Sequence, residues 1–111
     1  MAFEEIAAGV AAGNGSAAVI YQMPADSNGH LANVTAYNST GGALTLTITV
    51  FEADGSTSTL YVGSLAGGAT GSFSGTSANC ITPVSLLPGS KFQAQGSGAG
   101  IRVRVSGLRF Y

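Results

Sequence analysis

The segment "ALTLTITV", residues 43–50, alternates apolar and polar residues without a break. The even-numbered positions are apolar: Leu44, Leu46, Ile48 and Val50. The odd-numbered positions between them are threonines: Thr45, Thr47 and Thr49. A period of two predicts a β-strand with one buried face. The other face is unusual, because a strand face in water usually carries Lys and Glu, whereas this one carries only threonine.

Similar short signals recur along the chain between turn sequences. They are "SAAVIYQM", "HLANVTAYN", "STSTLYVGSL", "KFQAQG" and "IRVRVSGLRFY". The pair Asp54-Gly55 is typical of a hairpin turn, and no helical segment is long enough for a parallel crossover. We therefore predict an all-β fold, an antiparallel β-sandwich or jelly-roll-like domain of about seven or eight short strands.

The alternation also predicts which residues form the core. These are Val19, Leu44, Leu46, Ile48, Val50, Leu60, Val62, Ile101, Val103 and Val105. In the last segment the apolar residues change parity after Gly107, which a β-bulge at Ser106-Gly107 would explain. The alternative is that Gly107 ends the strand and the last four residues pack separately.

The first residues differ from the rest of the chain. In "MAFEEIAAGV" the apolar residues follow the spacing of one helix face: Phe3, Ile6, Ala7 and Val10. The glycines of "AAGNGS" then favour a flexible turn. We predict an N-terminal arm at residues 1–15 and a single β-sandwich domain at residues 16–111, since 111 residues suffice for one domain.

The low content of charged residues limits the kinds of molecule that this chain is expected to bind. Charged residues make up 8% of the chain, with a formal net charge of −1, against about 25% charged residues in a typical soluble domain. We therefore expect no direct nucleic-acid binding and no attraction to anionic lipid. No apolar segment is long enough to span a membrane. A surface with so few charges is poorly protected against association, which favours a surface covered in an assembly.

Residues able to do chemistry are scarce. The chain has one histidine, His30, and one cysteine, Cys80, which we interpret as a buried small hydrophobe. Asp26 and Asp54 lie in turn sequences, where aspartate commonly bonds its own backbone. We expect no catalytic residue, no metal site and no cofactor, and hence no enzyme.

The three arginines, Arg102, Arg104 and Arg109, form the single basic concentration. Arg102 and Arg104 share one face of the last predicted strand. Two interpretations remain open at this point: the pair binds carboxylates of another protein, or it is a solvated face.

Several features in order resemble the small all-β virion proteins of tailed bacteriophages, which include capsid decoration (cement) proteins and neck or tail accessory proteins. The "MAFEEIAAG" segment precedes "AVIYQMPADSNGHLANVTAYNSTGGALTLTITV", and the chain ends in "TPVSLLPGSKFQAQGSGAGIRVRVSGLRFY". The resemblance covers nearly the whole chain. The sequence departs from the family in being almost uncharged.

The resemblance implies a capsid decoration protein that binds the outer surface of the head and stabilises it. Its partners would be the major capsid protein and itself, as a homotrimer. We expect contacts through the arm, the threonines and the arginine pair: Phe3, Ile6, Val10, Thr45, Thr47, Thr49, Arg102 and Arg104. The arm would gain order on docking, so that its deletion leaves the domain folded. Glu4 and Glu5 stand where a signal peptide needs positive charge, so we expect synthesis in the host cytoplasm and a final location in the virion.

Two other functions remain in view. The first is a neck or tail accessory or connector protein of the virion. The second, from another class, is a carbohydrate-binding module, since jelly rolls are common lectin scaffolds. Sugar sites usually need exposed aromatic residues, but the chain has no tryptophan and its tyrosines are spread along the sequence.

Overall fold

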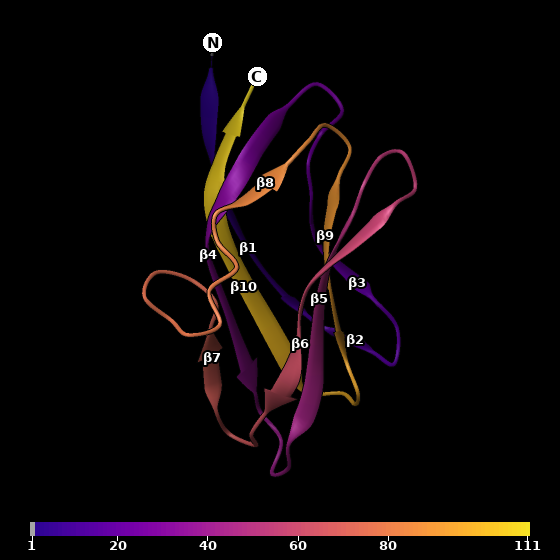
Figure 1. Cartoon of the computed structure of the whole chain (residues 1–111), viewed down its shortest axis with the longest axis vertical. Coiled ribbons are helices and arrows are strands. Elements are labelled where there is room, and N and C mark those ends of the chain that lie inside the picture. The colour runs from indigo at the N-terminus through magenta and orange to yellow at the C-terminus, as the bar shows by residue number, and fades with distance from the viewer. Residues whose placement is uncertain (1) are drawn as a thin grey trace.

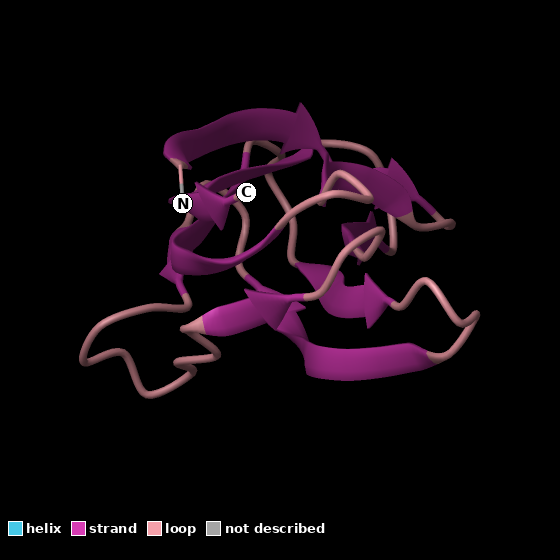
Figure 2. Ribbon diagram, turned by 90° about the horizontal axis from the view of Figure 1, so that it is seen from above, coloured by secondary structure: helices cyan, strands magenta, loops and turns pink. Residues whose placement is uncertain are grey.

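A computed structural model describes residues 2–111 as two sheets packed face to face (Figures 1 and 2). Ten strands make up these sheets: β1 (Phe3–Ala11), β2 (Gly13–Asn14), β3 (Ala18–Gln22), β4 (Asn28–Asn38), β5 (Leu44–Phe51), β6 (Thr57–Leu65), β7 (Thr70–Ser72), β8 (Val84–Leu86), β9 (Lys91–Gly96) and β10 (Ile101–Phe110). The described residues contain no helix. The predicted all-β sandwich is therefore confirmed.

Each sheet has five strands. The first sheet has the order β1-β10-β4-β7, with β8 also paired to β4, and the second has the order β2-β9-β5-β6, with β3 also paired to β9. All pairings are antiparallel except that of the two-residue β2 with β9. β5 and β6 form the hairpin that Asp54-Gly55 predicted, and Gly55 takes the positive φ of 92° that this turn needs.

The core lies between the sheets and follows the predicted alternation in β5 and β10. Their inward side chains are buried: Leu46, Ile48, Val50, Ile101, Val103 and Val105. Phe92 and Ala94 of β9 add to the same core, as do Leu31 and Val34 of β4. Leu44 and Leu60 are partly buried and pack against it.

Two predicted core residues point outward because bulges change the parity of their strands. In β3 the register shifts between Val19 and Tyr21, so Ile20 is buried while Val19 is 40% exposed. In β6 the register passes over Leu60, which turns Tyr61 toward the core and leaves Val62 60% exposed. Tyr61 fills the space by packing edge-on against Phe73, with ring centroids 4.7 Å apart.

The register shift predicted at Ser106-Gly107 is present, but the extra residue lies in the neighbouring strand and not in the last strand itself. The register between β10 and β4 shifts between Ser106 and Gly107, and the residue passed over is Ala32 of β4. A Cβ on Gly107 would lie 2.0 Å from the His30 carbonyl oxygen, so the close approach of the two backbones requires glycine. β10 continues to Phe110, so Gly107 does not end the strand.

The helical interpretation of the first residues is wrong. Residues Phe3–Ala11 form β1, which pairs with β10 along its whole length, from Phe3↔Phe110 to Ala11↔Arg102. Ile6 is 4% exposed and belongs to the core. Over its described residues, the predicted arm already has an ordered place in the first sheet without any partner. The two ends of the chain lie side by side, joined by bonds between Ala2 and Tyr111 (Figure 1).

Candidate interaction surfaces

The outer side of the second sheet forms a nearly neutral surface, which we call the threonine face. Its residues come from β5, β9 and β6, and those of β5 and β9 alternate with buried residues: Thr45, Thr47, Thr49, Thr59, Val62, Ser64, Gln93 and Gln95. Thr47 sits at the centre, opposite Gln95 of β9 and Val62 of β6. The sheet thus extends the uncharged row that the sequence showed for β5 alone across three strands.

The one charged residue of this surface, Lys91, lies at its end. Lys91 of β9 lies opposite Phe51, with its ammonium nitrogen 5.7 Å from the centre of the Phe51 ring. Hydroxyl and amide groups lose far less hydration free energy on burial than charged groups do. The threonine face can therefore be covered by another protein surface at low desolvation cost.

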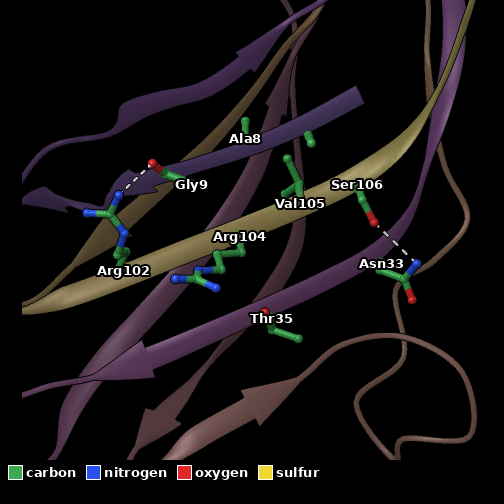
Figure 3. A pocket seen from close by; sticks show the side chains of 9 residues that line it. Ala8, Gly9, Asn33, Thr35, Arg102, Arg104, Val105 and Ser106 are labelled. Carbon is green, nitrogen blue, oxygen red and sulfur yellow. Dashed lines mark hydrogen bonds between the residues drawn. The ribbon is translucent and has the colours of Figure 1, made fainter. Parts of the chain in front are cut away.

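The outer side of the first sheet carries the arginine pair. Arg102 and Arg104 project from β10 beside the small residues of β1, over a shallow depression of about 510 Å³ (Figure 3). The Arg102 Nη2 donates to the Gly9 carbonyl oxygen at 3.0 Å. On the β4 side, Asn33 Nδ2 donates to Ser106 Oγ at 3.3 Å.

Neither Arg102 nor Arg104 has a carboxylate within ion-pair distance among residues 2–111. A smaller hollow of about 290 Å³ adjoins them and is lined by Tyr37 and Thr70. This arrangement can accept a carboxylate from outside the chain, since a guanidinium beside hydroxyl groups suits such a group.

Arg109 has a different, internal role. Its Nη1 lies 3.6 Å from Glu4 Oε2, and its Nη2 lies 3.6 Å from Asp26 Oδ1. The Nε donates to the buried Ser27 Oγ at 2.8 Å, and the guanidinium covers the Tyr111 ring at 4.3 Å. Arg109 therefore connects β1, the turn before β4 and the chain end. The three arginines are close in sequence, but Arg109 does not belong to the same surface site as Arg102 and Arg104.

The structure distributes the predicted contact residues over several environments. Thr45, Thr47 and Thr49 lie on the threonine face, while Arg102 and Arg104 lie on the opposite side of the sandwich, facing away from it. Phe3 and Val10 of β1 are 67% and 37% exposed.

Ile6 must be removed from the set of contact residues, because it is buried in the core. Sequence reasoning missed Val62, Gln93 and Gln95. The alternation of "KFQAQG" was the signal available for the two glutamines, whereas the bulge at Leu60 hid Val62.

Cys80 is exposed, which corrects the prediction of a buried side chain. It lies between β7 and β8, and its Sγ is 3.4 Å from the Thr82 carbonyl oxygen. Within residues 2–111 no three His, Cys, Asp or Glu side chains gather in a way that could hold a metal ion. No helix among these residues has the length and apolar character needed to cross a membrane.

Two titratable groups have shifted pKa values, each with a local cause. Burial raises the pKa of Tyr21, and the positive charge of Arg109 partly opposes this effect, while Glu4 adds to it. The pKa of Asp54 is lowered, first by the hydrogen bond from the Ser56 hydroxyl and then by the Ser56 backbone N–H. Both arrangements belong to turns and strand ends, and neither lies on the threonine face or beside the arginine pair.

Comparisons with known proteins identify a similar fold but assign the chain to no family. No protein-family model matches the chain, and no curated protein matches it. Among solved structures it is similar to a chain from work titled "Bacillus endospore appendages form a novel family of disulfide-linked pili", with a TM-score of 0.53 and 15% sequence identity. The match covers 98% of this chain and 86% of that one. At this identity the likeness shows that the two chains share an all-β fold.

Proposed function

We propose that this chain is a non-catalytic structural subunit of a bacteriophage virion, a capsid decoration protein that binds the outer surface of the head. The observation that carries the proposal is the threonine face. It spans three strands, offers hydroxyl, amide and methyl groups, and has its one charge, Lys91, at the end. Such a surface suits burial against another folded protein.

The partners in this proposal are the major capsid protein and further copies of the chain, as a homotrimer. Val62 is 60% exposed and lies opposite Thr47, so a large apolar side chain stands within the neutral surface. Val62 thus supplies apolar area, within a nearly neutral surface, that another protein could cover. The free energy of burying this face would add to the stability of an assembled shell.

A second candidate is a subunit of an extracellular filament. It is favoured by the likeness to the endospore-appendage chain, which extends over 98% of this sequence. That appendage is described as disulfide-linked, whereas this chain has one cysteine. A filament of this chain would therefore depend mainly on non-covalent contacts.

Sedimentation velocity of the purified chain, together with electron microscopy, distinguishes these assemblies. A trimer, or a larger closed species built from trimers, supports the decoration protein, and long filaments support the second candidate. Val62→Lys places a charge on the threonine face and should reduce assembly, whereas Leu87→Lys is a matched control, because Leu87 is 61% exposed and lies outside the sheet. A chain that stays monomeric at all concentrations and binds no virion surface would contradict the proposal.

A further inference from the structure

The outer edge of β1 carries backbone groups that no other strand uses. Ala2 and Tyr111 exchange both backbone hydrogen bonds, and Ala12 N–H donates to the Ile101 carbonyl at the other end of the pairing. Hydrogen-bonded pairs alternate along an antiparallel ladder, so the even residues of β1 bond to β10. The odd residues from Phe3 to Ala11 therefore direct their N–H and C=O groups away from the sheet.

This edge is long and accessible, and Glu5 is the one charged residue among its outward positions. β1 ends the strand order of the first sheet. Among residues 2–111, the one bond made to this edge from outside is that from Arg102 Nη2 to the Gly9 carbonyl. The outward side chains are all exposed: Phe3, Glu5, Ala7, Gly9 and Ala11. Unpaired edges of this kind are templates for the addition of another strand.

We propose that β1 pairs antiparallel with β1 of a second copy of this chain, with the two-fold axis at Ala7. Ala7 is the midpoint of β1, so this register overlaps the whole of Phe3–Ala11 with its counterpart. It brings odd residue to odd residue, as the hydrogen-bonding pattern requires. The first sheets of both copies then become one continuous sheet.

Side-chain size and charge favour this register. It places Glu5 opposite Gly9 of the second copy and Phe3 opposite Ala11 of the second copy, so each large side chain meets a small one. Within each copy, Gly9 lies beside Arg104 and Ala11 lies beside Arg102. Because Gly9 has no side chain, Arg104 can reach across it to the Glu5 carboxylate of the other copy.

The contact would satisfy charges that have no partner within one chain. Among residues 2–111, no carboxylate lies within ion-pair distance of Arg102 or Arg104, and no cationic side chain lies within ion-pair distance of Glu5. The two-fold axis forms each Glu5–Arg104 pair twice. In the dimer, the N–H of Glu5 from the second copy would donate to the Gly9 carbonyl oxygen in place of Arg102. The Arg102 guanidinium could then stack on Phe3 of that copy.

Disulfide trapping tests the register. In a Cys80→Ala background, Ala7→Cys places two thiols at the axis, where the Cα atoms are about 5.5 Å apart and within the range of a disulfide. Ala11→Cys is the matched control, because the two copies of that residue are about 27 Å apart. We expect mild oxidation to yield on the order of tenfold more covalent dimer for Ala7→Cys than for Ala11→Cys. Equal yields, or no dimer from either variant, would overturn the proposal.

A charge exchange tests the Glu5–Arg104 contact. Glu5→Arg should weaken dimerisation about tenfold, since two ion pairs are replaced by two repulsive ones. The double variant Glu5→Arg/Arg104→Glu should restore the wild-type dissociation constant, and failure to restore it in a folded protein would overturn the assigned contact. These readouts involve the edge of the first sheet alone, so they are separate from the threonine face and from capsid binding.

Discussion

The side-chain amide of Asn38 donates to the backbone carbonyl of Leu65 at 2.9 Å, joining the end of β4 in the first sheet to the end of β6 in the second. Asn38 is fully buried. Its amide also donates to the Gly42 carbonyl, and its Oδ1 accepts from the Thr40 hydroxyl at 2.6 Å. One side chain thus satisfies both the sheet-to-sheet contact and the turn into β5.

Replacing Asn38 should be strongly destabilising. Asn38→Leu removes the side-chain bonds to the Leu65 and Gly42 carbonyls and those from the Thr40 N–H and hydroxyl, so we expect the free energy of unfolding to fall by about 2–4 kcal/mol. Asn33→Leu, at an exposed position in the same strand, should change it by about 0.5 kcal/mol or less. Urea unfolding of both variants measures the difference, and similar stabilities would contradict the assigned role of Asn38.

Ile6 tests whether β1 is part of the folded domain. Ile6→Ala opens a cavity in the core and should cost about 2–4 kcal/mol, whereas Phe3→Ala, at a side chain 67% exposed, should cost about 0.5 kcal/mol or less. Thermal unfolding of the two variants measures this contrast.

Deletion of residues 1–12 would remove the strand that pairs with β10 and should destabilise the protein. This replaces the expectation that an arm can be deleted without loss of folding. A truncated chain with wild-type stability would show that β1 is dispensable.

Arg109 should matter for stability, unlike the other arginines. Arg109→Met removes the bond to the buried Ser27 and the pairs with Glu4 and Asp26. We expect a loss of about 1–2 kcal/mol, mainly from the Ser27 bond, because the two carboxylates are largely exposed. Arg104→Met, on the open outer face, is the control and should have a small effect on the monomer. Equal losses would indicate that Arg109 is one more surface cation.

The turn between β5 and β6 should depend on pH through Asp54. Its folded-state pKa is lowered by the two bonds from Ser56, so the carboxylate stabilises the turn fully above the aspartate pKa of the unfolded chain. This contribution is lost as pH falls through the lowered folded-state pKa. In an NMR titration, Ser56→Ala should raise the pKa of Asp54, whereas Ser58→Ala should leave it unchanged. An unchanged pKa of Asp54 in Ser56→Ala would show that the Ser56 hydroxyl does not lower it.

Alternation in the sequence was sufficient to predict β5, β10 and their buried residues. It failed at Val19 and Val62 because bulges at Ile20 and Leu60 reverse which parity faces the core. It failed for β1 because the outward residues of this exposed edge strand are mostly small. The apolar positions therefore matched a helix as well as a strand, and the pairing with β10, which is remote in sequence, decides the outcome.

The threonine row was visible in the sequence, but the extent of the neutral surface depends on strand order. Gln93 and Val62 become neighbours of the threonines because β9 and β6 flank β5. The separation of the arginine pair from Arg109 likewise depends on which face of β10 each side chain occupies.

Cryo-electron microscopy of intact virions that carry this chain tests the central proposal most directly, because it gives copy number and location together. We predict hundreds of copies at the threefold or quasi-threefold positions of the head, with the threonine face buried against a neighbouring protein. A few copies confined to the portal vertex or tail would contradict the capsid decoration function and indicate a connector. An exposed threonine face in either location would contradict the surface on which the proposal rests.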